Sequence, residues 1–375
     1  MATFLINASN LKNGGGLQVA RSICNGVGKY EQHRFLVVLS SYINDTGMSS
    51  IRNARLYRYD IQQNLKTVLL GRDNFLDNLV HQENVDAVLT IFGPSLWRPC
   101  VPHLCGFARA QLLLKDSPYY RHLSWKERIV YKIWAWGFRR SSKTFYTENK
   151  YISEMLPRLT KGAKVYTVTN YYNQVFDQPE QWQRNVKLPM FEGVTMLTVS
   201  STASHKNLKI MIPVSEYLER QHSDFHFRFV LTCQPEALNV PEYLKRHFVF
   251  VGKVDVAECP NLYEQADIMF MPTLLECFTA TYPEAMRMEV PIVTTDLEFA
   301  RGLCGDAACY YSAIDAAAAA EAIYKVATDK DYAQQLTEAG KKQLLTYDNY
   351  EQRADKLIGI LEEMAAMYHF NGKGI

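Results

Sequence analysis

Two glutamates eight positions apart, Glu276 and Glu284, are the side chains of this sequence best suited to holding a polyhydroxylated ligand. An ionised carboxylate accepts hydrogen bonds through both oxygens, so it can bind two neighbouring hydroxyls of a sugar or a ribose. The alternative is a pair of exposed glutamates, of which Glu284 merely favours the N-terminus of a helix. The spacing alone leaves both interpretations open.

The elements expected around the pair favour ligand binding. The apolar run Ile268–Met271 predicts a buried parallel strand, and Pro283 fits the first turn of a following helix. Glu276 then lies in the loop after the strand, and Glu284 lies at or just inside the helix start. Ligands of open α/β sheets bind at this edge, beyond the carboxyl ends of the strands.

Strand-like runs alternate with helix-length segments along the chain, which is typical of βαβ units with parallel sheets. The polar, proline-marked segment 176–190 is predicted to be a linker. We therefore expect an α/β protein with domains over 1–175 and 191–349 and a C-terminal helix over 350–375. The predicted strands are Thr3–Asn7, Arg34–Leu39, Val85–Phe92, His103–Phe107, Lys143–Tyr146, Lys164–Thr169, Val194–Val199, His226–Thr232, His247–Val251, Ile268–Met271, Ile292–Thr295 and Cys309–Tyr311.

The composition is that of an ordinary globular protein. Its 375 residues are 47% hydrophobic and 21% charged, without the run of about 18 apolar residues that a spanning helix needs. Met1–Asn7 lacks the basic start of a signal peptide and is expected to be the first strand. Eight scattered cysteines without zinc-like spacing predict a reduced, cytoplasmic protein with no metal site.

Charge is unevenly distributed along the chain. Residues 1–170 contain 23 Lys+Arg and 11 Asp+Glu, whereas residues 171–375 contain 18 and 28. The basic half should face an anionic partner or the acidic half. We find no nucleic-acid-binding motif and expect no nucleic acid, so an anionic membrane surface is the better candidate.

A predicted helix over 124–143 is the segment most suited to such a surface. Trp125, Ile129, Ile133 and Trp136 recur at helical spacing among lysines and arginines. Two interpretations remain open. The helix packs on the sheet with its tryptophans in the core, or it makes a peripheral, reversible contact with anionic headgroups.

The segment Pro272–Ala285 resembles the Glu-(seven residues)-Glu signature of retaining glycosyltransferases with the GT-B architecture, specifically glycosyltransferase family 4, the group 1 glycosyltransferases. That family typically reads Pro-Ser-x-x-Glu-Gly-Phe-Gly-x-x-x-x-Glu-Ala, and Cys277 and Thr279 replace two of its glycines here. The resemblance is dense from about Tyr166 to Tyr311. Further matches are Val249–Gly252, Leu262–Asp267, Pro291–Thr295, Gly305–Ala308, and Thr169–Asn170 with Phe176.

The resemblance implies two Rossmann-like domains whose parallel sheets face each other across a cleft, an acceptor-side domain over 1–175 and a nucleotide-sugar-binding domain over 191–349. It also implies that the last helix, over 350–375, crosses back to the first domain. It implies catalytic roles for Glu276 and Lys206, with Glu276 on the donor sugar and Glu284 on the ribose. Lys206 matches the family lysine that neutralises the donor diphosphate. The donor-binding residues carried over are Gly14, Gly15, Gly16, Ser201, Lys206, Gly252, Lys253, Glu276, Cys277, Phe278, Thr279 and Glu284.

Two positions of this donor site depart from the family pattern, and its glycine run has two explanations. The family's diphosphate-binding arginine is replaced by Ser201, so a bidentate guanidinium contact is missing. The family's catalytic histidine has no counterpart, because His103 is expected to point elsewhere. The glycine run Gly14–Gly16 opens a helix and would let backbone N–H groups approach an anion, although a plain tight turn explains it as well.

The implied activity is transfer of a hexose from a nucleoside-diphosphate sugar to a glycan or lipid-linked acceptor, with retention at the anomeric carbon. Cell-surface polysaccharide synthesis would be its setting. It would need neither cofactor nor metal, and the protein would be cytoplasmic or peripheral on the inner face of the membrane. The alternatives are a catalytically weak nucleotide-sugar-binding protein, or another GT-B enzyme such as a nucleotide-sugar epimerase.

Overall fold

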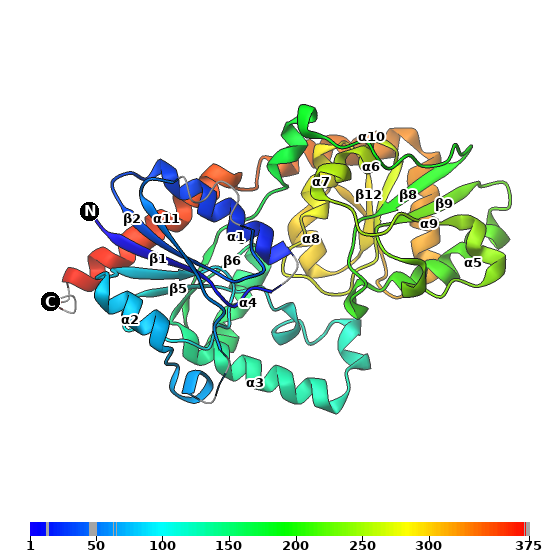
Figure 1. Ribbon diagram of the computed structural model, residues 1–375. Coiled ribbons are helices and arrows are strands. Elements are labelled where there is room, and N and C mark those ends of the chain that lie inside the picture. Colours follow the sequence, from blue (N-terminus) through cyan, green and yellow to red (C-terminus); the bar gives the residue numbers. More distant parts are fainter. Residues whose placement is uncertain (13–14, 45–50, 63, 65, 371, 373–375) are drawn as a thin grey trace. The chain divides into compact units, whose positions relative to one another are not determined.

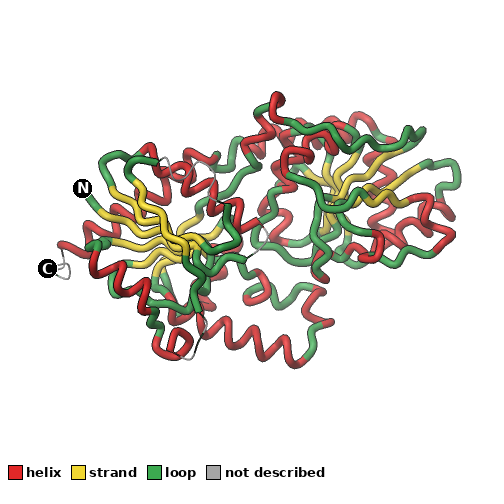
Figure 2. The backbone as a smooth tube through the Cα atoms, viewed as in Figure 1, coloured by secondary structure: helices red, strands yellow, loops and turns green. Residues whose placement is uncertain are grey.

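The computed structural model describes residues 1–12, 15–44, 51–62, 64, 66–370 and 372. These residues form two compact units, each with its own parallel sheet (Figure 1). The first unit comprises residues 1–113, 124–170 and 348–375, and the second comprises 114–123 and 171–347. In each unit the strands form one twisted sheet with helices on both of its faces (Figure 2). The α/β fold with two parallel sheets is confirmed.

The first unit has seven parallel strands in the order β3-β2-β1-β4-β5-β6-β7. Side chains alternate between the two faces of β1, so Phe4 and Ile6 join one apolar cluster and Leu5 joins another. The strands are β1 Thr3–Ala8, β2 Arg34–Leu39, β3 Ala54–Arg58, β4 Ala87–Thr90, β5 His103–Gly106, β6 Thr144–Thr147 and β7 Lys164–Thr167. The helices are α1 Gly15–Gly26, α2 Asn74–Gln82, α3 Trp125–Ser141, α4 Lys150–Thr160 and α11 Tyr350–Phe370.

The second unit has six parallel strands in the order β10-β9-β8-β11-β12-β13. Its core packs aromatic rings of β9 against β10 and β11, with Phe229 in contact with Phe248 and Phe270. The strands are β8 Val194–Thr198, β9 Phe227–Leu231, β10 Phe248–Phe250, β11 Ile268–Met271, β12 Ile292–Thr295 and β13 Ala308–Tyr311. The helices are α5 Met211–Gln221, α6 Cys259–Glu264, α7 Thr281–Arg287, α8 Glu298–Cys304, α9 Ala316–Thr328 and α10 Lys330–Leu344.

The predicted strands are found in place, most within one or two residues of the expected bounds. The runs Arg34–Leu39, Ile268–Met271 and Ile292–Thr295 coincide with β2, β11 and β12. The edge strand β3 was not predicted, because its side chains are half-buried or exposed and lack an apolar run. Among the described residues, no helix combines the length and the apolar character needed to cross a lipid bilayer.

Helix α11 belongs to the first unit, although it follows the whole second unit in the sequence. It packs beside α1 and contributes Leu357, Ile358 and Leu361 to the core formed by β1, β2 and β4. Where the chain passes between the units, Asp348 accepts a hydrogen bond from the Thr169 backbone N–H at 2.9 Å, and the Asp348 N–H donates to the Thr169 hydroxyl at 2.6 Å.

A buried polar cluster lies next to this crossing. Arg353 of α11 donates hydrogen bonds to Oδ1 of Asn170 and to the Ser22 hydroxyl, the latter at 2.8 Å. Glu148, directly after β6, is also buried. Burial raises the pKa of Glu148 to about 7, and the nearby Arg353 charge and the Asn170 amide partly oppose that rise. The cluster joins α1, β6 and α11 within the first unit.

Candidate functional site

The loops after β8, β10 and β11 carry most of the predicted donor-binding residues. Because the six strands are parallel, these loops meet at one edge of the second unit's sheet. The strands β8 and β11 are direct neighbours, so the turn Ser204–Lys206 and the loop that contains Glu276 lie side by side. The Leu274 N–H donates to the His205 carbonyl at 2.8 Å, which ties the two together.

Lys206 and Glu276 form an ion pair at this edge. The Lys206 ammonium donates to Oε1 of Glu276, and the Thr273 hydroxyl donates to the same oxygen at 3.0 Å. Each charged side chain is only 12% exposed, so solvent screens the pair much less than a surface pair. The structure therefore brings together the two residues that we predicted to be catalytic.

Three neighbours of the pair were not predicted. The imidazole Nε2 of His205 lies 4.0 Å from Oε1 of Glu276. Burial lowers the pKa of His205, and the Glu276 carboxylate acts in the opposite direction. The Tyr119 ring meets His205 edge-on at 6.0 Å, and the Ser117 hydroxyl donates to the Leu274 carbonyl at 2.6 Å. Tyr119 and Ser117 come from the short segment 114–123, which carries no motif that could reveal this placement.

Glu284 occupies a different environment, inside α7. It is buried, and the Tyr263 hydroxyl donates to its Oε2 at 3.2 Å. Burial raises the pKa of Glu284 to about 7, while the Tyr263 hydrogen bond partly lowers it. A carboxyl with such a pKa changes charge near neutral pH, so a ligand that donates hydrogen bonds to it also changes its protonation.

The remaining predicted residues of the second unit lie in the loops after β8, β10 and β11. Cys277 and Thr279 are buried, and the Thr279 hydroxyl pairs with that of Thr281 at 2.8 Å. Phe278 is half-buried against Tyr347, with ring centroids 6.2 Å apart. Ser201 and Lys253 are exposed in the loops after β8 and β10. Gly252 has φ +73°, a conformation that L side chains rarely adopt, which explains glycine there.

The glycine run belongs to the first unit. Gly15 and Gly16 form the start of α1, and Gly14 lies outside the described residues. A Cβ at Gly15 would meet no atom within 4 Å, whereas one at Gly16 would touch the Phe92 ring at 3.4 Å. His103 is buried, and its ring nitrogens contact the Thr90 hydroxyl at 2.8 Å and the Ser141 carbonyl at 2.9 Å. Burial lowers the pKa of His103 to about 4, so this histidine is a neutral core residue.

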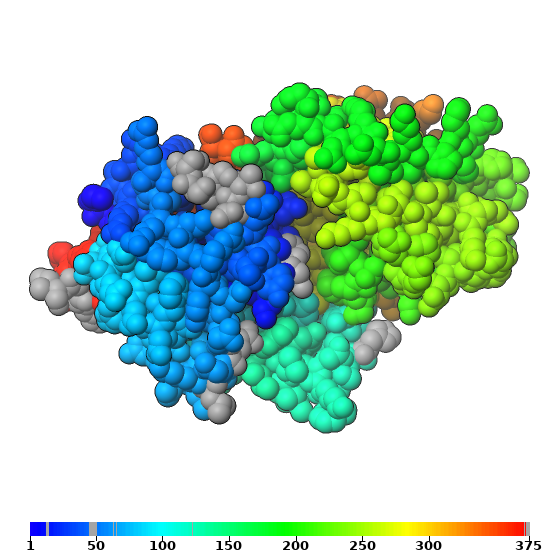
Figure 3. Space-filling model, viewed as in Figure 1, coloured from blue at the N-terminus to red at the C-terminus, as the bar shows by residue number. Residues whose placement is uncertain are grey.

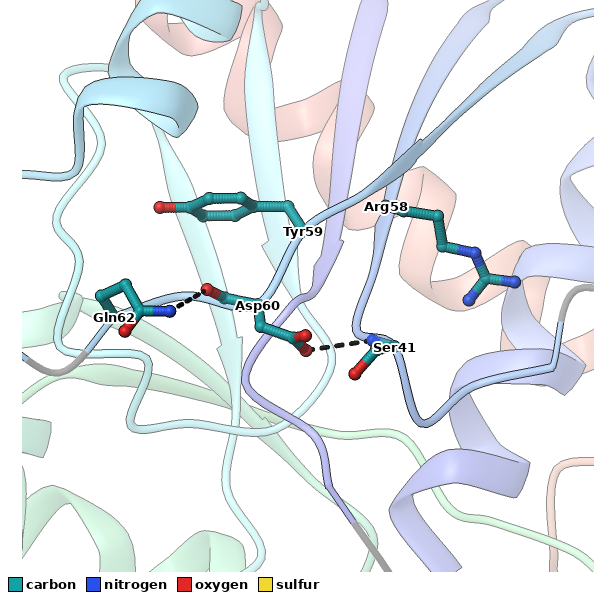
Figure 4. A pocket seen from close by; sticks show the side chains of 5 residues that line it. All are labelled: Ser41, Arg58, Tyr59, Asp60 and Gln62. Carbon is teal, nitrogen blue, oxygen red and sulfur yellow. Dashed lines mark hydrogen bonds between the residues drawn. The ribbon is translucent and has the colours of Figure 1, made fainter.

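The first unit also contains a hollow of about 560 Å³ at the carboxyl ends of β2 and β3 (Figure 4). Asp60 accepts the Ser41 backbone N–H at 3.0 Å, and the Gln62 amide donates to the Asp60 carbonyl at 3.2 Å. The lining thus offers a carboxylate, a hydroxyl and an amide, which are groups that recognise hydroxylated ligands. The lining residues are Ser41, Arg58, Tyr59, Asp60 and Gln62.

Solved structures of other proteins share the fold of this chain. The chain resembles a glycosyltransferase from Rickettsia africae ESF-5, with 16% identity, a TM-score of 0.69, and coverage of 97% of this chain and 98% of that one. It resembles sucrose-phosphate synthase from Thermosynechococcus elongatus, with 12% identity, a TM-score of 0.70 and coverage of 98% and 100%. It also resembles Anabaena HepE in complex with UDP and glucose, with 13% identity, a TM-score of 0.63, and coverage of 96% of this chain and 99% of that one. The fold is GT-B.

A family model matches most of the second unit. Residues 193–329 match the family model described as glycosyl transferases group 1. No significant match to a curated protein sequence is found. The second unit therefore carries a glycosyltransferase domain of the group 1 type, and the predicted resemblance to that group is confirmed over these residues.

Proposed function

We propose that the protein is a retaining hexosyltransferase that moves a sugar from a nucleoside-diphosphate sugar to a glycan or lipid-linked acceptor, in the synthesis of cell-surface polysaccharide. The ion pair of Lys206 and Glu276 carries the proposal, because it puts a cation and a sugar-binding carboxylate together at the ligand edge of the sheet. The group 1 domain and the fold shared with HepE, solved with UDP and glucose, support it.

In the proposed reaction each residue has one task. The acceptor hydroxyl oxygen bonds to the anomeric carbon as the bond from that carbon to the donor diphosphate breaks, and the hydroxyl proton passes to the departing diphosphate. The Lys206 ammonium leaves Glu276 for this diphosphate and stabilises the negative charge that grows on it. Glu276 then accepts sugar hydroxyls and faces the positive charge that develops at the anomeric carbon. Glu284 accepts the ribose hydroxyls, and backbone N–H groups of 277–279 contact the sugar. The acceptor binds the first unit, where the hollow beside Asp60 offers partners for hydroxyls.

One observation supports a second candidate function. Ser201 stands where the family has an arginine, so the diphosphate has one cation fewer in this loop. A nucleotide-sugar-binding protein with weak catalysis would keep the contacts of Glu276 and Glu284 with the donor but would have a low turnover rate. Lys253, in the loop after β10, is a candidate replacement for the missing cation, and its side chain is exposed.

The proposal predicts acceptor-dependent turnover. A panel of nucleotide sugars is first ranked by thermal shift, because a bound donor raises the apparent stability. The best donor is then incubated with candidate glycan acceptors, with and without EDTA. We expect nucleoside diphosphate to be released only when an acceptor is present, with EDTA having no effect and the product having the anomeric configuration of the donor. Tight donor binding without turnover on any acceptor would favour the second candidate, and an inverted product would contradict retention.

A further prediction concerns the charge of Glu284. Ribose hydroxyls that donate to this carboxylate favour its ionised form, so the pKa of about 7 in the free protein should fall on binding. Donor affinity should therefore rise as the pH increases through 7, with release of up to about one proton. Calorimetry with UDP-glucose at pH 7, in two buffers of different ionisation enthalpy, measures that proton. The Glu284→Gln variant should bind the donor more weakly and release no proton. Equal proton release by the variant and the natural protein would show that Glu284 does not bind the ribose.

A further inference from the structure

The amino-terminal part of α3 is exposed to an unusual extent for an apolar segment. Trp125 is 68% exposed, Ile129 47% and Ile133 52%. These three residues recur every fourth position and therefore form one stripe along the helix. An exposed stripe of large apolar side chains marks an interaction surface in soluble proteins.

The helix is capped at its start and packed into the first unit near its other end, so the stripe lies on a well-formed helix. Ser124 and Glu127 form a capping box at its start. Near its other end Phe138 is buried between Phe107 and Phe145, with ring centroids 4.8 and 6.3 Å away. The core interpretation thus fits only the carboxyl-terminal part of the helix, and the membrane interpretation stays a prediction for the exposed amino-terminal part. The carboxyl-terminal part packs into the first unit, Trp134 and Trp136 are half-buried, and the amino-terminal part lies on the surface (Figure 3).

The charges around the stripe are almost all positive. The helix contains five basic residues and one acidic residue, Glu127, which the capping box engages. At 100° per residue, Arg128, Lys132 and Arg139 follow one border of the stripe, and Lys126 and Arg140 lie within or beside it. Glu127 falls on the opposite side of the helix.

A second element extends the same surface. The helical turn Lys66–Leu70 exposes Leu69 and Leu70 by 53% and 60%. Arg140 of α3 donates to the Leu69 carbonyl at 3.0 Å while its guanidinium stacks on Trp136, 4.4 Å from the ring centroid. Arg98 donates to the Leu70 carbonyl. Two exposed leucines therefore lie beside the carboxyl-terminal end of α3, on a turn whose carbonyls are held by Arg98 and Arg140.

We propose that α3 and the turn Lys66–Leu70 form a face of the first unit that docks on an anionic phospholipid membrane. Apolar side chains would enter the headgroup boundary while the flanking cations meet lipid phosphates, as in interfacial amphipathic helices. A nucleic acid would match the cations but leave Ile129, Ile133, Leu69 and Leu70 without a partner. The inference deepens the proposed function, on which it rests only for the lipid-linked nature of the acceptor.

Vesicle co-sedimentation of the full chain, without donor or acceptor, tests the docking face separately from catalysis. The vesicles are phosphatidylcholine alone or phosphatidylcholine mixed with phosphatidylglycerol, at low and high salt. We expect binding only to the anionic vesicles, weakened by salt. The triple variant K126Q/R128Q/K132Q should bind about 100-fold more weakly, since each cation contributes about fivefold. The matched control K187Q/K330Q/K342Q removes the same charge from exposed lysines of the second unit and should bind as the natural protein does.

Separate variants test how much the apolar side chains contribute to vesicle binding. I129S/I133S and L69S/L70S keep every charge and should each lose most of the salt-resistant binding, while circular dichroism confirms that the fold is retained. Equal loss in the lysine control, or no binding to anionic vesicles at low salt, would overturn the proposal. Sedimentation velocity tests for self-association. A dimer that forms without lipid and dissociates in the I129S/I133S variant would show that this face binds a second copy of the chain instead of a membrane.

Discussion

Glu276→Gln is expected to reduce kcat by about 100-fold or more while KM for the donor stays the same or falls. Glutamine keeps the size of the side chain but removes the charge that faces the developing positive centre, and one such group is typically worth about 100- to 1,000-fold. The variant also releases Lys206 from its ion pair, which leaves the ammonium free for the donor diphosphate. A fall in kcat without a rise in KM is the signature of a group that acts in the transition state. Steady-state kinetics with the nucleotide sugar that ranks best by thermal shift measure both constants.

Thr273→Val is the matched control for this experiment. It removes a hydrogen bond to the same Glu276 oxygen, at 3.0 Å, but leaves the carboxylate charge in place. We expect a loss of about tenfold or less, because the ion pair with Lys206 still orients the carboxylate. If Glu276→Gln acted only through KM, or if both variants lost the same activity, Glu276 would be a binding residue and the mechanism proposed above would be wrong.

Arg353→Met is expected to destabilise the first unit by about 3 kcal/mol at pH 8, because it leaves the buried Glu148 carboxylate without its neighbouring charge. It also removes the hydrogen bonds to Asn170 and Ser22. The loss in the free energy of unfolding should be smaller at pH 5. The folded pKa of Glu148, about 7, lies above its ordinary value of 4.5, so its contribution to stability is full below about pH 4.5 and is lost as the pH rises towards 7. Without Arg353 that folded pKa rises further, and the loss of stability continues above pH 7.

Urea unfolding at pH 5 and pH 8 measures the free energy of unfolding of each variant. The double variant Glu148→Gln/Arg353→Met removes both the Glu148 and the Arg353 charges and should recover the pH-dependent part of the loss of stability but not the lost hydrogen bonds. A destabilisation that is the same at both pH values would mean that Glu148 does not depend on the Arg353 charge.

The sequence predicts the local framework of the donor site well. The apolar run Ile268–Met271 and Pro283 place Glu276 in a loop and Glu284 in the first turns of a helix, and the structure has both there. Short-range patterns succeed here because each strand is buried on both faces and each helix start has its own residue preferences. The roles of these residues in binding and catalysis stay predictions.

Contacts between distant segments could not be predicted. Lys206 and Glu276 are 70 positions apart, and only the pairing of β8 with β11 makes them neighbours. Tyr119 reaches His205 from a segment whose neighbours in the sequence belong to the other unit. Periodicity likewise finds the stripe on α3 but cannot say whether another element covers it, because that depends on packing elsewhere in the chain.

The position of α11 has a consequence for the order of events during synthesis. Leu357, Ile358 and Leu361 complete the core around α1, yet the ribosome makes them after all of the second unit. Until then Ala20, Ile23 and Cys24 of α1 lack the helix that packs beside them. The first unit therefore cannot complete its core until the second unit has been synthesised, and until then the apolar side chains of α1 that α11 covers are open to a nascent-chain chaperone.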